Sequence, residues 1–139
     1  MSNEINFQNP TKQEIKELLD KVETIAVVGI SAKQDRDSYY VARYLKQQGY
    51  KVVPVNPQYD EVLGEKCYPD LKSIPEHVDV VDIFRKPDAV PQIVDEAIEI
   101  KADVIWMQYE TYNAEAAQKA LDAGLKVIAD KCIKVEHSF

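Results

Sequence analysis

Five short, largely apolar runs rich in β-branched residues constrain the fold of this chain more than any other feature. Strands that are apolar on both faces occur mainly in parallel sheets that helices cover on both sides. We therefore predict an α/β fold in which these runs form about five parallel strands. The predicted strands are Thr24–Val28, Lys51–Val55, Val78–Phe84, Asp103–Met107 and a strand that begins with Lys126–Ile128.

Helical patterns separate the predicted strands. Thr11 and Glu14 have the spacing of a capping box, in which each side chain accepts from the other residue's backbone amide. Apolar residues at helical spacing follow this box and recur after three of the predicted strands. The predicted helices are an N-terminal helix over 11–22, a helix from about Ser38 that ends at Gly49, and two helices capped by Asp88 and Asn113.

The segment 58–77 is the least regular part of the chain. It contains Gly64, Pro69 and Pro75, and we predict a loop with one short helical turn. No Gly/Ser-rich linker, low-complexity tract or repeat divides the chain. We therefore predict one domain over residues 1–139, with a Rossmann-like, doubly wound sheet, helices on both faces and an additional N-terminal helix.

An acidic composition limits the partners that the chain can bind. The net charge is −7, whereas nucleic-acid surfaces gather lysine and arginine, so we expect no nucleic-acid partner. The segment 1–10 lacks the blocks of a signal peptide, and no apolar run approaches the ~20 residues that span a bilayer. Cys67 and Cys132 have no metal-ligand spacing and indicate a reducing compartment. We therefore predict a cytoplasmic protein without a membrane partner.

In open parallel sheets, ligands bind outside the carboxyl ends of the strands, which makes the loop after the first predicted strand a candidate anion site. Gly29 permits a tight turn, and the helix that starts near Ser38 offers free backbone amides. Lys33 and Arg36 add positive charge. The G-x-G-x-x-G pattern is absent, which disfavours the usual NAD site. Alternatively, Gly29 only forms a turn and the two cations are solvated.

The ends of the second and third predicted strands supply further candidates. Asn56 and Pro57 end the second strand without the carboxylate that holds the ribose in an NAD site, so this end is compatible with a phosphorylated ribose. Phe84 can pack against an apolar ligand arm, and Arg85 or Lys86 can bind a phosphate. Two alternatives remain open: Asn56 and Pro57 only stop the strand, and Phe84 is a core residue beside two surface charges.

Other reactive side chains lack a catalytic or metal-binding pattern. His77 and His137 have no Ser, Cys or Glu partner at a known spacing, and neither H-E-x-x-H nor C-x-x-C occurs. Cys132 follows Lys131, a neighbour that can activate a thiol for exchange with a thiol ligand, but a buried and inert thiol is the favoured interpretation. We expect no metal and no catalytic residue. Structural roles are expected for Trp106, Asp79 and Asp82.

Several segments in a fixed order carry a family resemblance: Ala26–Ser31, Arg36–Tyr39, Gly49–Pro57, Val78–Pro87, Val104–Gln108 and Ala123–Cys132. In these segments the chain resembles the small stand-alone CoA-binding proteins related to the nucleotide-binding domain of the succinyl-CoA synthetase α subunit. The similarity runs from about residue 11 onward and depends on the ordered set rather than on one specific motif.

The resemblance implies a five-stranded parallel sheet with CoA or an acyl-CoA over its carboxyl edge. It implies phosphates at the first loop, adenosine beside 55–57 and the pantetheine arm near Gln108. The family usually has a small apolar turn with Gly after this glutamine, whereas Tyr109–Tyr112 follow here, so the acyl group stays open. The implied cofactor-binding residues are Gly29, Ile30, Ser31, Ala32, Lys33, Arg36, Ser38, Tyr39, Val55, Asn56, Pro57, Phe84, Arg85, Lys86 and Gln108.

We therefore expect a non-catalytic module that binds CoA and acts as a sensor, a carrier or a partner subunit with an unidentified protein partner. The first alternative is a nucleotide-dependent enzyme of the NAD(P) type, with Asp130 or Glu110 as its acid or base. The second is a protein-interaction module with a vestigial cleft, closed by Tyr39 or Tyr109, whose acidic surface binds a basic partner.

Overall fold

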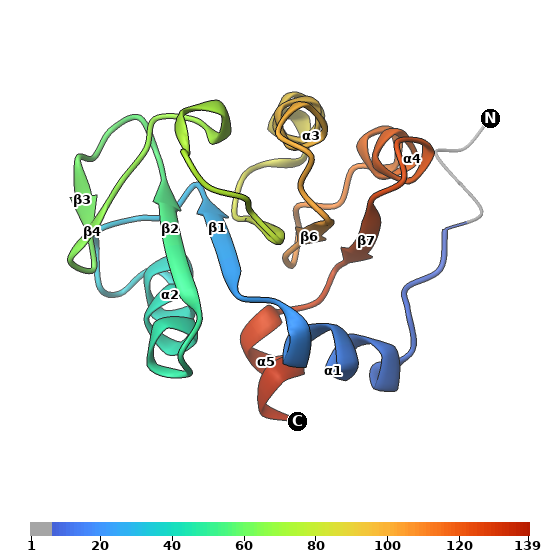
Figure 1. Ribbon diagram of the computed structural model, residues 1–139, viewed down its shortest axis with the longest axis horizontal. Coiled ribbons are helices and arrows are strands. Elements are labelled where there is room, and N and C mark those ends of the chain that lie inside the picture. The colour runs from blue at the N-terminus through green and yellow to red at the C-terminus, as the bar shows by residue number, and fades with distance from the viewer. Residues whose placement is uncertain (1–6) are drawn as a thin grey trace.

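A computed structural model describes residues 7–139, in which helices and strands alternate (Figure 1). A hairpin (β3 Glu61–Val62, β4 Glu65–Lys66) and two 3₁₀ helices (η1 Leu71–Ser73, η2 Pro87–Ala89) lie in the connections. Residues 1–6, part of the segment in which no signal peptide is predicted, lie outside this description. No helix in the described part is long and apolar enough to cross a bilayer. The main elements are α1 Lys12–Lys21, β1 Thr24–Val28, α2 Asp37–Gln47, β2 Lys51–Val55, β5 Val80–Ile83, α3 Val90–Glu99, β6 Val104–Met107, α4 Ala114–Asp122, β7 Lys126–Ala129 and α5 Ile133–Ser138.

Five strands form one parallel sheet in the order β2-β1-β5-β6-β7 (Figure 1). The strand order therefore reverses between β1 and β5. Val27 of β1 pairs with Pro54 on one side and with Asp82 on the other. Pro54 is tolerated because β2 is an edge strand, where the missing N–H of proline leaves no neighbouring strand unpaired. The predicted five-stranded parallel sheet is confirmed.

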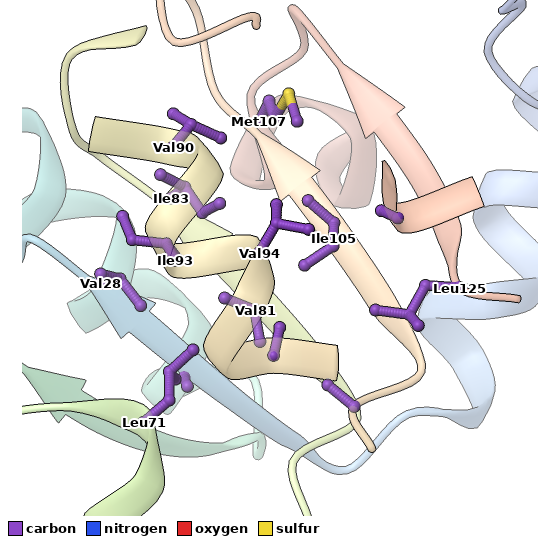
Figure 2. Close-up of a cluster of buried hydrophobic side chains, with 14 of the residues drawn as sticks. Val28, Leu71, Val81, Ile83, Val90, Ile93, Val94, Ile105, Met107 and Leu125 are labelled. Carbon is purple, nitrogen blue, oxygen red and sulfur yellow. The ribbon is translucent and has the colours of Figure 1, made fainter. Parts of the chain in front are cut away.

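Helices cover both faces of this sheet (Figure 1). α3 and α4 pack on one face, where Figure 2 shows Ile93 and Val94 of α3 beside Val81 and Ile105 of β5 and β6. α1, α2 and α5 pack on the other face, against a core that contains the fully buried Trp106. Every residue of β5 and β6 is buried, as expected for central strands of a sheet with two covered faces. The doubly wound arrangement and the core position of the tryptophan are confirmed.

Local hydrogen bonds explain where two of the helices begin. The side-chain oxygen of Thr11 accepts from the backbone N–H of Glu14 at 3.1 Å, and the Glu14 carboxylate accepts from the N–H of Thr11 at 2.8 Å. The side chain of Asn113 accepts from the N–H of Ala116 at 2.9 Å at the start of α4. Both predicted caps are confirmed, and each satisfies an amide that has no partner within its helix.

The predicted cap at Asp88 is wrong. Asp88 lies within η2, and α3 begins at Val90 with Ala89 as its N-cap and without a capping side chain. The reason is that η2 runs directly into α3, so that the N–H of Val90 donates to the carbonyl of Pro87. The next residue, Pro91, has no N–H to satisfy. The helix therefore starts without an acceptor side chain.

Two elements lack a signal in the sequence. The segment 58–77 contains the predicted short helical turn as η1, but it also contains the hairpin β3–β4. Leu63 and Gly64 form the hairpin turn with positive φ angles of 57° and 75°, and leucine is unusual in that conformation. α5 follows β7 after a short connection and has too few residues to show a helical stripe.

Candidate functional site

The reversal of strand order brings the ends of β1, β2 and β5 together around Gly29. The N–H of Gly29 donates to the carbonyl of Val55 at 2.9 Å, and the N–H of Phe84 donates to the carbonyl of Val28 at 2.9 Å. The three loops predicted to form a site therefore start from neighbouring positions on the carboxyl edge of the sheet. This reversal is where open parallel sheets usually bind their ligands.

Gly29 occupies a position that a residue with a side chain would strain. Its φ of +86° lies in the left-handed region, and a Cβ at this position would stand 2.4 Å from the carbonyl oxygen of Phe84 and 2.6 Å from Cδ of Arg85. The Arg85 side chain thus lies against the Gly29 backbone. Glycine allows this close approach, which places an arginine at the reversal point of the sheet.

The loop after β1 is closed by its own hydrogen bonds. The hydroxyl oxygen of Ser38 accepts from the N–H of Ser31 at 2.9 Å, and that of Ser31 accepts from the N–H of Lys33 at 3.0 Å. The N–H of Arg36 donates to the carbonyl of Lys33 at 3.1 Å. Ser38 is buried, whereas Ala32, Lys33 and Arg36 are exposed. The loop therefore presents its two cations to solvent on a locally ordered backbone.

The N-terminus of α2 faces the same loop. Arg36 is the N-cap residue, and its side chain forms no capping hydrogen bond. The first amides of a helix have no partner within the helix and carry partial positive charge, so an uncapped start can bind an anion. Asp37 in the first turn also interacts favourably with this end of the helix and competes with an external anion.

Four cations lie at this edge without a carboxylate partner. Lys33 and Arg36 belong to the loop after β1, Arg85 and Lys86 belong to the loop after β5, and all four are exposed. The ion pairs found within residues 7–139 involve other side chains. Because Asp35, Asp37 and Asp88 are exposed in or next to the same two loops, the cations offer individual contacts to an anion rather than a uniformly positive surface.

Asn56 connects the loops that follow β1 and β2. Its side-chain amide donates to the carbonyl of Ile30 at 2.8 Å, and its side-chain oxygen accepts from the N–H of Gln58 at 2.8 Å. Val55 before it is buried and Pro57 after it is exposed. The end of β2 thus carries a neutral amide that is already hydrogen bonded, where an NAD site has a carboxylate.

A cavity of about 170 Å³ lies beside Gly29, between the sheet edge, η1 and α3. Oδ1 of Asp70 accepts from the N–H of Ser73 at 3.0 Å. Oε1 of Glu96 accepts from the N–H of Leu71 at 3.0 Å. The cavity is smaller than the ~300–1,000 Å³ of typical ligand pockets, so a large ligand has to extend over the open edge. Its lining residues are Val28, Gly29, Val55, Pro57, Pro69, Asp70, Leu71, Arg85, Ala89, Gln92, Ile93 and Glu96.

Sequence reasoning missed the contribution of η1 and α3 to this cavity. Asp70 lies in the irregular segment and is the N-cap residue of η1. An aspartate at this position indicates that a helical turn begins here, but it does not indicate where that turn packs in the folded chain. Gln92 and Glu96 are ordinary surface residues of a helical pattern. Their proximity to Gly29 depends on how the connection after β2 folds, which no local motif specifies.

Several predicted cofactor-binding residues have side chains that belong to the fold. Ile30 is fully buried, and Phe84 and Tyr39 are half-buried against the core on the α1, α2 and α5 face. Gln108 is buried, and its Oε1 accepts from the N–H of Ile133 at 3.1 Å. A ligand contact by these four residues stays a prediction, and a structural role is already visible for each of them.

The remaining reactive side chains have structural contacts. Cys132 is buried, as is Cys67, whose pKa is raised by its burial. Nδ1 of His137 forms a hydrogen bond with the Tyr44 hydroxyl at 2.7 Å. His77 contacts two aspartates at the opposite, amino edge of the sheet. His137 therefore has Tyr44 as its partner, and His77 has Asp103, a residue 26 positions away. Neither contact follows from a motif in the sequence.

Comparison with known proteins identifies the family. A family model for the CoA binding domain matches residues 23–138. The chain belongs to the family of CoA-binding domains. The uncharacterised protein YneT of Bacillus subtilis is 44% identical over 132 residues, which are 95% of this chain and 98% of YneT. A hypothetical protein of Pyrococcus horikoshii OT3 is also 44% identical and superposes with a TM-score of 0.92 over 97% of each chain.

CoA-binding domains of this family also occur within larger enzymes. The alpha subunit of the ADP-forming acetate–CoA ligase II of Pyrococcus furiosus is 32% identical over 125 residues, which are 82% of this chain and 27% of that subunit. The chain thus corresponds to about a quarter of the ligase subunit. The resemblance to CoA-binding domains seen in the sequence is confirmed as homology to this region of the ligases.

Proposed function

We propose that this chain binds CoA or an acyl-CoA at the carboxyl edge of its sheet and acts as a non-catalytic module. One observation carries the proposal: the loops after β1 and β5 bring four exposed cations, Lys33, Arg36, Arg85 and Lys86, to the carboxyl edge, and none of them has an ion-pair partner within residues 7–139. At this edge Arg85 lies against Gly29, and α2 starts without a capping side chain. CoA carries a pyrophosphate and a 3′-phosphate, and several cations with free backbone amides compensate such a group well.

The end of β2 favours CoA over NAD as the ligand. An NAD site places a carboxylate at this strand end to hold the ribose hydroxyls, and a carboxylate would repel a 3′-phosphate. Asn56 is neutral there, and both ends of its side-chain amide are hydrogen bonded to backbone groups. A phosphorylated ribose is therefore compatible with this end of the sheet.

A role without catalysis is part of the proposal. The two carboxylates that line the cavity beside Gly29, Asp70 and Glu96, accept hydrogen bonds from backbone amides and cap η1. Both carboxylates therefore have a visible structural role at the start of η1. Asp130 and Glu110 are exposed at the carboxyl edge and are the candidates for the enzyme alternative. Turnover of acetyl-CoA or of a nicotinamide cofactor that is lost on Asp130→Asn would favour that alternative.

A protein partner fits the same proposal. The relative from Pyrococcus furiosus is named as the alpha subunit of a ligase, which supports an assembly with another chain as one role of this domain. A sensor or a carrier of CoA is equally compatible with the site described above. Chromatography of the purified chain with candidate subunits, with and without CoA, tests whether the ligand promotes an assembly.

Calorimetric titration of the chain with CoA, dephospho-CoA and NAD⁺ tests the ligand. We expect saturable binding of CoA, weaker binding without the 3′-phosphate, and weaker binding still of NAD⁺. Arg36→Gln and Arg85→Gln should each weaken CoA binding about tenfold, because each removes a charged hydrogen-bond donor. Lys12→Gln on α1 is the matched control, since it makes the same charge change at another exposed site.

Two results would overturn the assignment of the site. One is the absence of heat with CoA at millimolar concentration. The other is an equal loss of affinity in Lys12→Gln and Arg85→Gln, because a general charge effect would then account for the binding. Equal affinities for CoA and dephospho-CoA would exclude the proposed role of the 3′-phosphate while leaving the pyrophosphate contact to the loop after β1.

A further inference from the structure

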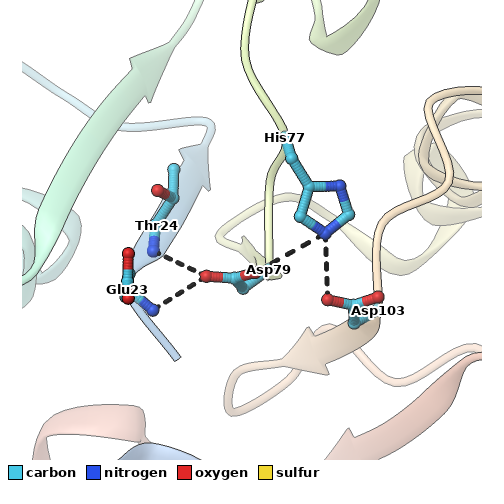
Figure 3. A network of polar contacts seen from close by, with 5 residues as sticks. All are labelled: Glu23, Thr24, His77, Asp79 and Asp103. Carbon is cyan, nitrogen blue, oxygen red and sulfur yellow. Dashed lines mark hydrogen bonds and ion pairs between the residues drawn. The ribbon is translucent and has the colours of Figure 1, made fainter. Parts of the chain in front are cut away.

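Three side chains of metal-ligand type meet at the amino edge of the sheet, opposite the carboxyl edge. Nε2 of His77 lies 3.0 Å from Oδ2 of Asp103 and 3.5 Å from Oδ1 of Asp79. Figure 3 shows dashed contacts from one nitrogen of the imidazole ring to each of the two carboxylates. His77 and Asp79 lie just before β5, and Asp103 lies just before β6, so the parallel pairing of these strands brings the group together.

Asp79 is held in place by the backbone of β1. Its Oδ2 accepts from the N–H of Glu23 at 2.8 Å and from the N–H of Thr24 at 2.9 Å (Figure 3). Its backbone carbonyl accepts from the N–H of Asp103 at 3.2 Å. Hydrogen bonds of this kind orient a ligating carboxylate and are characteristic of metal sites. The other oxygen of Asp79, Oδ1, is the one directed toward His77.

We propose that His77, Asp79 and Asp103 bind a divalent transition-metal ion, with Zn²⁺ as the best-suited ion. The three ligand atoms lie within 4.8 Å of one another. Zinc forms bonds of about 2.0–2.2 Å to histidine nitrogen and carboxylate oxygen, so two of its ligands in tetrahedral geometry stand about 3.4 Å apart. The nitrogen–oxygen distances of 3.0 and 3.5 Å already match this spacing.

Charge and exposure set the character of this site. Two carboxylates and a neutral imidazole carry a charge of about −2, which balances a divalent cation when the metal takes the place of the Nε2 proton. His77 and Asp103 are exposed, so water completes the coordination. One nitrogen with two oxygens is a donor set for Zn²⁺ or a neighbouring transition ion, rather than for Ca²⁺ with its six to eight oxygens.

A metal ion at this position would connect the amino ends of three adjacent strands, β1, β5 and β6. Asp79 is hydrogen bonded to the start of β1, and the other two ligands precede β5 and β6. An ion that binds only the folded chain stabilises it by mass action. Because the cluster lies at the edge opposite Gly29 and the proposed CoA site, the metal and CoA should bind independently, and this inference does not rest on the proposed function.

The test uses the chain after treatment with a chelator and removal of that chelator. We expect saturable heat on titration with Zn²⁺, a rise in the melting temperature with Zn²⁺, and visible d–d absorption on addition of Co²⁺. His77→Gln and Asp103→Asn replace exposed side chains and should fold, and each should weaken Zn²⁺ binding at least about tenfold. His137→Gln, which removes the other histidine, is the matched control and should bind Zn²⁺ as the unchanged chain does.

The inference is overturned if Zn²⁺ produces no saturable heat and Co²⁺ no d–d absorption. It is also overturned if His77→Gln retains full affinity, or if His137→Gln loses affinity to the same extent as His77→Gln. In those cases the cluster is a surface ion pair only. CoA binding measured on the same variants should not change, so that failure here and failure of the proposed function can be told apart.

Discussion

The side-chain oxygen of Gln108 accepts a hydrogen bond from the backbone N–H of Ile133 at 3.1 Å in the protein interior. This bond connects the end of β6 with the first residue of α5, a helix whose N-cap residue provides no side-chain acceptor. Nε1 of Trp106 donates to the carbonyl of Lys131 at 2.8 Å just before the same helix. Because a helix of this length is not stable by itself, these bonds to β6 fix its position.

The first prediction separates the structural role of Gln108 from a ligand contact. Gln108→Leu keeps a similar volume but leaves the N–H of Ile133 buried without an acceptor, so we expect a loss of about 1–3 kcal/mol in the free energy of unfolding. CoA affinity should stay the same. Urea unfolding and calorimetry measure the two quantities. Unchanged stability together with weaker CoA binding would instead assign the side chain to the ligand, as the family resemblance implies.

The second prediction compares two glycines that both have positive φ. Gly49 has a φ of +98°, and a methyl group there would meet no neighbouring atom within 4 Å, whereas a methyl group on Gly29 would meet the carbonyl oxygen of Phe84. Gly49→Ala should cost about 1–2 kcal/mol from backbone strain alone. Gly29→Ala should cost more and should also weaken CoA binding. Equal losses of stability in urea unfolding would show that the contact with Phe84 relaxes freely.

The strands could be predicted because strands buried on both faces appear in the sequence as continuous apolar runs. Thr24–Val28 and Lys51–Val55 are found with the predicted bounds. The third strand is shorter than the predicted Val78–Phe84, although the N–H of Asp79 and the N–H of Phe84 still donate to β1 at its two ends. The two strands whose bounds agree are the two that combine an apolar sequence with a closing signal, Gly29 after β1 and Pro57 after β2.

The site could be predicted only in part, because strand ends share an edge but their side chains need not face a ligand. Gly29, Asn56 and Arg85 meet around the reversal of strand order as their positions after successive strands require. The cavity wall from η1 and α3 was not predictable, since it depends on tertiary packing. The contact between His77 and Asp103 joins positions 26 apart and arises only from the register of β5 and β6.

The third prediction concerns Asn9, which takes the place of a strand partner at the edge of β7. Its amide donates to the carbonyl of Ala129 at 3.0 Å, and its oxygen accepts from the N–H of Ala129 at 2.8 Å. Asn9→Ala should lower the free energy of unfolding by about 1–3 kcal/mol and promote self-association through the exposed edge. Thermal unfolding and light scattering measure both effects. Gln8→Ala is the matched control, and identical behaviour of the two variants would contradict the proposed role.

The fourth prediction concerns the dependence of stability on pH. Asp82 is fully buried in β5, and neither of its carboxylate oxygens has a hydrogen-bond partner among the described residues. Burial raises the pKa of Asp82 well above its ordinary value, because the protein interior disfavours the charged form of the carboxyl group. In the unfolded chain the group ionises near pH ~3.9. Above that pH the folded state binds more protons than the unfolded state, so stability falls as the pH rises toward the folded pKa.

Asp82→Asn removes this ionisation while it keeps the shape of the side chain. The stability of the variant should therefore lack the loss, which amounts to about 1.4 kcal/mol per pH unit between the unfolded and folded pKa values. We expect the variant to exceed the unchanged chain in free energy of unfolding at pH 8 and to approach it near pH 4, as measured by urea unfolding. Asp20→Asn, at an exposed site on α1, is the control and should not alter the pH profile. A constant difference between Asp82→Asn and the unchanged chain across this range would mean that a polar contact or water molecule stabilises the ionised carboxylate inside the sheet.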